Sequence, residues 1–305
     1  MTAPAPDRQT AIFQAHRAVL QDIAYRMLGS VSEAEDAVQE TWVRWHRHGG
    51  DGIDRPRAWL VTTLSRLCID ALKSARRQRE IYVGPWLPEP VETDAGGIDS
   101  ERLAVSVRTA FLLVLERLTP VERAAYLLHD IFDMGYDEVA ATLGRSETAC
   151  RKTVSRARTR VQAAKPRFEM APPDQQRLAE QFLQSILTGE LEPLKRMLAD
   201  DAQLWADGGG RVLAARNVIR GRDAVARFLV GVAGKAPPTI STEYGRVNGG
   251  PGLLVWDGAD LVAAFSVELA TDGTISHVFT VRNPDKLAHL IKARHPVTPG
   301  VTTDQ

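Results

Sequence analysis

The chain has 305 residues, with 38 basic and 38 acidic side chains, so its formal net charge is zero. At about 100–200 residues per domain, this length predicts two or three cores. No apolar run approaches the ~18 residues of a membrane span and no signal-like segment begins the chain, so we expect a cytoplasmic protein without a membrane partner. Cys68 and Cys150 lie far apart without a CxxC pair, which predicts neither a disulfide framework nor a metal site.

The charges are distributed unevenly along the chain. Residues 66–79 carry five basic side chains against one acid, and residues 145–167 carry eight against one. Residues 80–101, between them, contain six acidic residues and no Lys or Arg. Two basic clusters separated by an acidic segment favour two contacts to a polyanion, although a single cluster of this kind is as often a solvated helix face.

Residues 8–80 show helical periodicity throughout, with apolar side chains at the spacing of a buried helical stripe. Ser32, with Glu35 three residues later, has the capping-box pattern that begins a helix, and a further helix is predicted over 57–79. The helix that follows Ser32 has another face, directed away from its apolar residues, that contains Asp36, Gln39, Glu40 and Val43.

The remainder of the chain divides by composition. Residues 81–100 contain closely spaced prolines, glycines and acids and predict a linker, whereas residues 101–168 return to a helical pattern. The region 172–292 mixes helices with short alternating segments, and residues 293–305 are expected to be a disordered tail. In this region, helices are predicted over 174–187 and 191–199, and strands over 202–206, 212–216, 239–246, 253–257, 260–269 and 275–281, with a hairpin turn at Asp272-Gly273.

Residues 136–158 contain the most specific motif and predict a helix-turn-helix. Ala140 is the small residue needed where two helices cross, and Gly144 allows the positive φ that the turn requires. Ser146 then caps the second helix, with Cys150 on its inward stripe. The outward face, which would meet bases and phosphates, carries Thr148, Arg151, Lys152, Ser155, Arg156 and Arg158. A basic helical hairpin without a DNA-binding role is the alternative.

Three motifs in this order resemble those of the extracytoplasmic-function (ECF) sigma factors, the small class of bacterial RNA polymerase specificity subunits. Residues 36–45 look like the family's polymerase-clamp-binding helix, and residues 58–77 look like its −10 promoter-reading helix. Residues 115–130, followed by the helix-turn-helix, look like its −35-binding domain. The resemblance implies two all-α sigma domains, 8–80 and 101–168, joined by the linker.

The resemblance also implies a function. The chain would direct core RNA polymerase, bound through the β′ clamp and the β flap, to specific promoter DNA, with no enzymatic activity and no cofactor. In the −10 helix, the side chains expected to meet DNA are Trp59, Arg66, Lys73, Arg76, Arg77 and Arg79. Many family members have Asn at the position of Arg66, and a Trp at the spacing of Trp59 is more often a core residue.

The third region resembles the SnoaL-like cone, an α+β fold in which a curved antiparallel sheet and helices enclose a pocket. The segments Trp-Leu-Pro-Glu-Pro (86–90), Asp-Gly-Gly-Gly-Arg (207–211) and Asn-Pro-Asp-Lys-Leu (283–287) resemble those of the sigma subgroup that carries this extension. The resemblance implies that the extension regulates its own sigma core. The interface expected for this regulation contains Trp86, Leu87, Pro88, Asp207, Gly208, Gly209, Gly210 and Arg211.

Read by themselves, residues 207–210 predict a tight turn between two strands, or else a loop that packs on the sigma core or on the linker. Trp205 and His277 are the residues that we expect to meet in a pocket of the cone. A lone His on an apolar face is usually structural, so binding of an unidentified apolar metabolite is favoured over acid–base catalysis.

Two other functions are compatible with parts of the chain. One is a ligand-sensing helix-turn-helix regulator that acts without replacing sigma, and the other is a SnoaL-type isomerase or cyclase fused to DNA-binding helices. The regulator leaves the acidic helix around Asp36 and the basic cluster at 66–79 without a role, so the sigma function is favoured.

Overall fold

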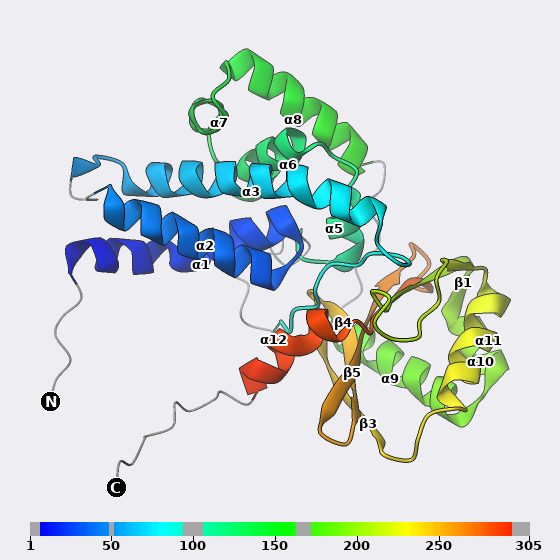
Figure 1. The fold of residues 1–305 in the computed structure, drawn as a ribbon. Helices are drawn as coiled ribbons and strands as arrows, with labels where there is room; N and C mark the ends of the chain where they lie inside the picture. The colour runs from blue at the N-terminus through cyan, green and yellow to red at the C-terminus, as the bar shows by residue number, and fades with distance from the viewer. Residues whose placement is uncertain (1–6, 49–51, 94–105, 163–171, 295–305) are drawn as a thin grey trace, which may run out of the picture. The chain divides into compact units, whose positions relative to one another are not determined.

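The structure, a computed structural model, describes residues 7–48, 52–93, 106–162 and 172–294, apart from the side chains of 75–80, 172–173, 175–176 and 292–294. The chain forms two compact units, Met1–Tyr82 with Ile98–Pro166, and Val83–Gly97 with Arg167–Gln305. The regular elements in the described part of the first unit are helices, whereas the second unit contains a six-stranded sheet (Figure 1). The linker segment 83–93 therefore belongs to the second unit, although the helix-turn-helix region separates the two in sequence.

Three long helices form the first part of the first unit: α1 (Arg8–Leu28), α2 (Val31–Arg47) and α3 (Pro56–Glu80). Gly29 ends α1 in a left-handed conformation, with φ 71°. The hydroxyl of Ser30 accepts the Glu33 amide at 3.2 Å, so Ser30 begins α2 and the expected cap at Ser32 is wrong. The Ser-x-x-Glu pattern occurs at both positions, and the C-cap at Gly29 lets the next helix begin directly after it.

Shorter helices form the second part of this unit: α5 (Thr109–Leu115), α6 (Pro120–Tyr126), the π-helical turn η2 (Leu127–Ile131), α7 (Tyr136–Leu143) and α8 (Glu147–Gln162). They pack directly on the long helices. Arg123 on α6 donates from Nε to the carbonyl of Arg26 on α1 at 3.1 Å. The hydroxyls of Thr62 on α3 and Thr142 on α7 lie 3.2 Å apart. The two predicted sigma domains thus share one compact unit.

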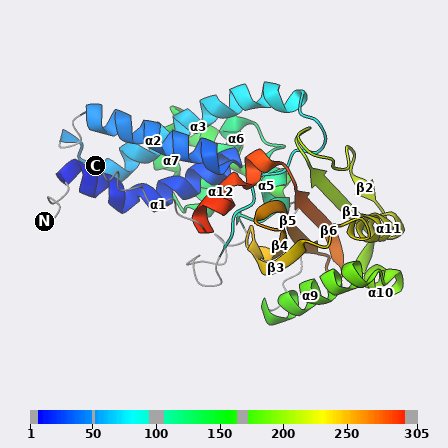
Figure 2. The same cartoon turned by 60° about the horizontal axis from the view of Figure 1, so that its bottom comes forward.

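The second unit begins with two helices and ends with one: α9 (Pro172–Thr188), α10 (Leu191–Met197) and α12 (Pro284–Arg294). Between them lie α11 (Arg222–Ala233) and the strands β1 (Leu198–Asp207), β2 (Ile219–Arg220), β3 (Ile240–Val247), β4 (Gly250–Asp257), β5 (Asp260–Leu269) and β6 (Ile275–Val281). The sheet order is β2-β1-β6-β5-β4-β3 (Figure 2).

The sheet is mixed rather than wholly antiparallel. All neighbouring strands run antiparallel except β1 and β6, which pair in parallel with Leu204 opposite Val278. A parallel pair requires a long crossover, and α11 with the β3–β5 meander supplies it. One face of the sheet carries Leu204 and Val278 into a core with apolar residues of α9, α10 and α11, such as Phe182 and Leu229.

Several predicted elements of this unit are confirmed and others are wrong. The turn at Asp272 is confirmed, because its carboxylate accepts the Thr274 amide at 2.9 Å between β5 and β6. Residues 212–216 form no strand, and Leu213 is 89% exposed. Residues 207–210 are therefore not a turn between two strands. Helices α11 and α12 were not predicted, and α12 extends the folded region to Arg294, whereas residues 295–305 lie outside the described residues.

Candidate polymerase, promoter and regulatory interfaces

The predicted helix-turn-helix is formed by α7 and α8. Gly144 adopts φ 63°, and its amide bonds to the carbonyl of Ala140, which is buried between the helices. The hydroxyl of Ser146 accepts the Ala149 amide at 3.3 Å and so caps α8. The inward stripe of α8 is fully buried and consists of Cys150, Val154, Ala157 and Val161. Burial raises the pKa of the Cys150 thiol, consistent with a small core residue.

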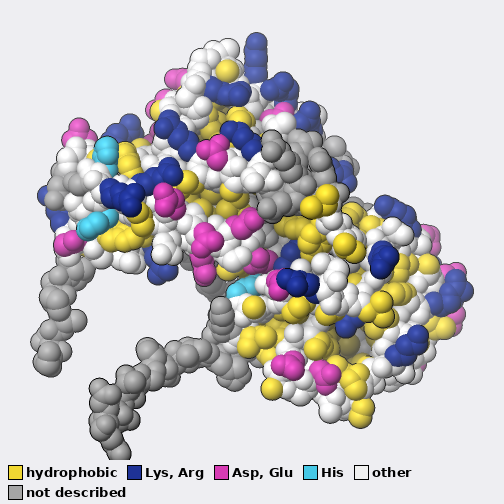
Figure 3. Space-filling model, in the orientation of Figure 1, with side chains coloured by type: hydrophobic (Ala, Val, Ile, Leu, Met, Phe, Trp, Pro, Cys, Tyr) yellow, Lys and Arg dark blue, Asp and Glu magenta, His cyan; other side chains and the backbone are white. Residues whose placement is uncertain are grey.

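The opposite face of α8 is open to solvent, and Lys and Arg side chains gather over this helix (Figure 3). The six predicted DNA-facing residues are all exposed: Thr148, Arg151, Lys152, Ser155, Arg156 and Arg158. Arg151 lies 3.4 Å from a carboxylate oxygen of Glu147 and 4.3 Å from the ring centroid of Tyr136. These contacts hold the Arg151 side chain in place without burying it.

Arg158 has a partner within the unit. Its Nε and Nη2 donate to the two carboxylate oxygens of Asp130 at 2.9 and 2.7 Å, and this pairing raises the guanidinium pKa. Asp130 belongs to η2, so the bidentate contact fixes α8 to the preceding turn. A DNA phosphate would have to compete with both of these hydrogen bonds.

Helix α3 contains the six predicted −10 residues. Arg66 and Lys73 are exposed, and Lys73 lies 2.8 Å from Asp70. Trp59 is half-buried, and its ring centroid is 5.5 Å from that of Trp45, a fully buried core residue. Trp59 therefore has a packing role whether or not it also meets DNA. Arg76, Arg77 and Arg79 lie in α3, but their side chains are outside the described residues.

Helix α2 has one buried apolar face and one accessible face, as the sequence predicts. Asp36 and Gln39 are exposed and Glu40 and Val43 are half-buried, whereas Trp45 is fully buried. The Glu40 carboxylate pairs with Arg44 of the same helix at 2.8 Å. The four predicted residues thus form an accessible surface, in which Asp36 is the most open acid.

The three segments that resemble the subgroup's motifs meet in the second unit. The buried carboxylate of Asp207 accepts the Leu87 amide at 2.8 Å and the Lys286 ammonium at 2.7 Å. Lys286 also donates to the Leu87 carbonyl at 2.5 Å, and its ammonium lies 4.3 Å from the centroid of the Trp86 ring. One ion pair therefore joins the linker, the end of β1 and the start of α12. This contact, formed by Leu87, Asp207 and Lys286, is called the linker anchor below.

The glycines that follow Asp207 let the backbone of residues 208–210 pack closely beside the linker anchor. A Cβ on Gly208 would lie 2.5 Å from the Val212 carbonyl oxygen, so this position has no room for a side chain. Gly209 and Gly210 have positive φ, and Arg211 pairs with Asp285 at 3.0 Å. The linker also continues beyond Pro88, which is buried: Val91 donates to the side-chain oxygen of Asn248 at 3.3 Å. The sequence analysis did not predict Asn248 as an interface residue. It included Lys286 only as part of the motif 283–287, without a role of its own.

Trp205 and His277 share one face of the sheet, opposite the face that packs on α9, α10 and α11. Both rings lie near Phe279, with centroids 6.5 Å from Trp205 and 5.7 Å from His277. Burial lowers the pKa of His277, which favours the neutral imidazole. The two residues are neighbours, but they lie outside the helix-covered face where the cone pocket was expected. Among the described residues, no cluster of His, Cys, Asp and Glu could hold a metal ion.

Comparison with protein families matches two parts of the first unit. The model for Sigma-70 region 2 matches residues 12–78, and the model for Sigma-70 region 4 matches residues 101–161. In the described parts of the chain, we find no helix with the length and apolarity needed to cross a membrane.

Individual relatives extend the match over nearly the whole chain. The ECF RNA polymerase sigma factor SigJ of Mycobacterium tuberculosis H37Rv is 37% identical over 287 residues, 90% of this chain and 91% of the relative. The crystal structure of Mycobacterium tuberculosis SigJ has a TM-score of 0.71 and 33% identity, and covers 92% of this chain and 98% of that chain. The probable sigma factor SigI of the same species is 35% identical over 197 residues, 63% of this chain and 67% of the relative.

Proposed function

Because this chain belongs to the ECF RNA polymerase sigma factors, which bind core polymerase and promoter DNA, we propose how its surfaces divide that work. The observation that carries the proposal is helix α8, whose apolar stripe is fully buried while its basic and hydroxyl side chains are exposed. This helix reads the −35 element in the major groove, with Arg151 and Lys152 toward base edges. Arg156 contacts phosphate on the same side.

Two surfaces of the long helices complete the assignment. The exposed cations of α3, Arg66 and Lys73, contact DNA at the −10 element, where strand opening requires that a base leave the stack. The α2 surface around Asp36 and Gln39 binds the clamp of polymerase, where charges on the rim set orientation and association rate. The second contact with polymerase is made by the helix-turn-helix domain, which binds the β flap.

The C-terminal cone acts on the sigma unit through the linker. The linker anchor fixes residues 86–88 to the cone, so the length of chain left free between the sigma helices depends on whether this anchor is closed. The cone thereby modulates promoter use without a separate protein. An unidentified small molecule bound by the cone would act through the same connection.

Run-off transcription with purified core polymerase tests the assignment. The full chain should yield promoter-specific transcripts, and core polymerase alone should not. DNA binding by the chain alone, without transcripts when polymerase is added, would instead favour a regulator that does not replace sigma.

Reversing charge on the α2 surface should weaken polymerase binding. The double variant Asp36→Lys/Glu40→Lys places like charges opposite a basic partner surface, so we expect about tenfold weaker association, measured by surface plasmon resonance at low salt. Asp260→Lys is the control for charge reversal, because Asp260 is exposed and belongs to the second unit rather than to α2. Equal binding by the double variant and the control would place the clamp contact elsewhere.

Truncating the recognition residues should weaken promoter binding. Arg151→Ala and Lys152→Ala should each cost about 1–3 kcal/mol if the side chain reads a base edge. The measurement is duplex binding by fluorescence anisotropy, with a duplex mutated in the −35 element for comparison. Arg117→Ala removes an exposed charge outside α8 and serves as the control. Loss of affinity that is equal on both duplexes would assign these residues to phosphate contact only.

A further inference from the structure

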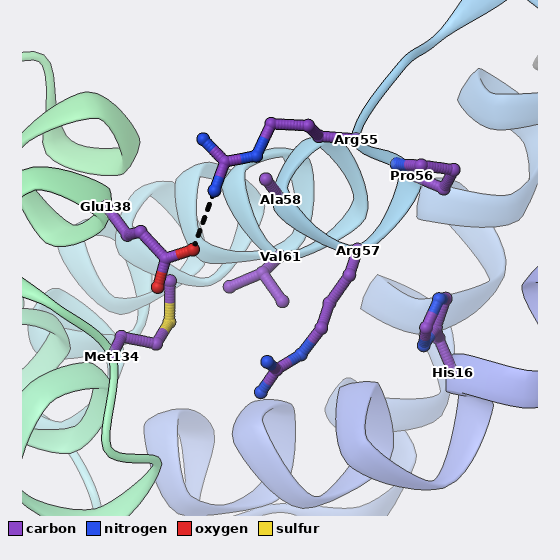
Figure 4. Close-up of a pocket in the computed structure, with 8 residues that line it drawn as sticks. All are labelled: His16, Arg55, Pro56, Arg57, Ala58, Val61, Met134 and Glu138. Atoms are coloured by element: carbon purple, nitrogen blue, oxygen red, sulfur yellow. Dashed lines mark hydrogen bonds and ion pairs between the residues drawn. The ribbon is translucent and has the colours of Figure 1, made fainter.

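A cavity of about 310 Å³ lies in the first unit where α1, the start of α3 and the segment leading into α7 come together. His16 of α1, Arg57 of α3 and Glu138 of α7 contribute to its wall (Figure 4). None of these residues belongs to the surfaces assigned above. A volume near 300 Å³ is at the lower end of the range for small-molecule sites.

Positive charge predominates in this cavity. Arg55 points toward Glu138, with 3.3 Å between Nη2 and Oε1, so the single acid in the wall is already paired (Figure 4). Arg57 extends in another direction (Figure 4), and it makes no hydrogen bond or ion pair with any residue that the structure describes. The first turn of α3 contains no acidic residue, so the positive end of this 25-residue helix adds to the field.

His16 shows the same lack of a counter-charge. Burial and, next, the charge of Arg57 lower the pKa of its imidazole. An anion placed between the two side chains would remove this repulsion and accept hydrogen bonds from both.

The rest of the wall is apolar. Val61 and Met134 are 2% and 6% exposed, and Ala58 lies on the same turn of α3 as Arg57. The cavity thus combines a cationic rim with an apolar floor. This combination fits a molecule that carries an anionic group on a compact apolar body, rather than an inorganic anion or a neutral hydrocarbon.

We propose that this cavity binds a small organic anion, a phosphate or carboxylate on a compact apolar body, and that the bound anion holds α7 against α1 and α3. The second half of the proposal rests on the proposed function, because α7 belongs to the −35-reading domain and α3 to the −10 contact. A ligand that touches both halves favours the arrangement in which they are in contact, and therefore opposes simultaneous use of the two promoter elements.

Calorimetric titration of the full chain with phenyl phosphate tests the site without polymerase. We expect saturable binding with one ligand per chain, and much weaker binding of inorganic phosphate and of phenol. Arg57→Gln should weaken phenyl phosphate binding about tenfold, whereas Arg57→Lys should retain most of it. Arg17→Gln, which removes an exposed charge from the neighbouring position of α1, should have no effect.

Ala58→Leu separates a cavity from a merely basic surface, because it fills the space and leaves every charge in place. This variant should lose phenyl phosphate binding while keeping its circular dichroism spectrum. No saturable binding to the wild-type chain, or equal binding by Ala58→Leu, would overturn the site. The site would also be overturned if Arg57→Gln weakened binding to a DNA duplex but left phenyl phosphate binding unchanged, since Arg57 would then belong to the DNA surface.

Run-off transcription then tests the regulatory half. Saturating phenyl phosphate should reduce promoter-specific transcripts from the wild-type chain and leave those from Ala58→Leu unchanged. Binding without any effect on transcription would overturn the regulatory half and leave the site standing. Absence of transcripts without ligand would count against the proposed function rather than against the site.

Discussion

Lys286→Met is expected to destabilise the second unit by about 3–5 kcal/mol, because it removes the cation from a buried carboxylate. Asp207 is fully buried, and the ammonium of Lys286 lies 2.7 Å from its Oδ2 with only 9% of the lysine side chain exposed. Removing one partner of such a pair costs far more than replacing both. The double variant Asp207→Asn/Lys286→Met should therefore be more stable than Lys286→Met alone.

Thermal unfolding followed by circular dichroism measures the destabilisation, and hydrogen exchange at the Leu87 amide reports on the linker itself. This amide donates to Asp207, so its protection should fall in Lys286→Met before the sheet amides are affected. Lys195→Met is the control, since Lys195 pairs with the largely exposed carboxylates of Glu192 and Asp223, and such pairs contribute about 0–1 kcal/mol. Equal effects of the two substitutions would mean that the linker anchor does not hold the linker.

The helix-turn-helix could be predicted from the sequence because its determinants are local. Gly144 supplies the positive φ, Ala140 the close helix approach and Ser146 the cap, all within one short segment. The same locality allowed the choice of exposed residues on α8, because helical spacing fixes which positions face away from Cys150.

Local patterns failed where two solutions were equally good or where long-range packing decided. The Ser-x-x-Glu pattern fits Ser30 and Ser32, and only the end of α1 distinguishes them. The apolar run 212–216 looks like a strand, yet it does not join the sheet and Leu213 is left exposed. Helix α11 has apolar residues at helical spacing, so the sequence contains its signal even though no helix was predicted there.

The linker anchor illustrates a different limit. Its members could be selected as motif residues, but no local rule pairs Asp207 with Leu87, 120 positions earlier, or with Lys286, 79 positions later. The parallel pairing of β1 with β6 brings the end of β1 beside the start of α12 and so creates the contact. The resemblance could therefore select the residues of the linker anchor, whereas the pairing of Asp207 with Leu87 and Lys286 followed only from the sheet topology.

The interface between the two halves of the first unit has a feature that suits reversible opening. Arg123 is only 2% exposed, and its Nη1 pairs with Glu116 while its Nη2 has no hydrogen-bond partner among the described residues. Burial lowers the pKa of Arg123 to about 9, so the charged form is penalised where it lies. Opening the interface returns this guanidinium to water, which offsets part of the free-energy cost of exposing the apolar surfaces around it.

Geometry makes such opening necessary for the proposed promoter contacts. The hydroxyls of Thr62 and Thr142 touch. Along α3, Arg66 and Lys73 lie about 6 and 17 Å beyond Thr62. Thr148 is six positions after Thr142, at most ~22 Å away, and Arg156 lies about 12 Å further along α8, so the whole path stays below ~60 Å. The numbering of the −10 and −35 elements places them about 25 base pairs apart, which is roughly 85 Å of duplex at 3.4 Å per base pair. While Thr62 and Thr142 stay in contact, α3 and α8 cannot occupy both elements.

Locking Thr62 to Thr142 should therefore abolish promoter-specific transcription. In Thr62→Cys/Thr142→Cys, the two sulfurs replace oxygens that lie 3.2 Å apart, within reach of a disulfide after small adjustments. Cys68 and Cys150 are both fully buried, and burial raises the pKa of Cys68 to about 12, so neither should compete for oxidation. We expect at least about a tenfold loss of run-off transcripts after oxidation and recovery after reduction. The reason is that the cross-link keeps α3 and α8 closer together than the −10 and −35 elements are. Each single cysteine variant should transcribe normally under both conditions. If the oxidised double variant, verified as cross-linked, transcribes like the reduced protein, then α3 and α8 do not bind the two elements at once, and the assignment of one of these helices must change.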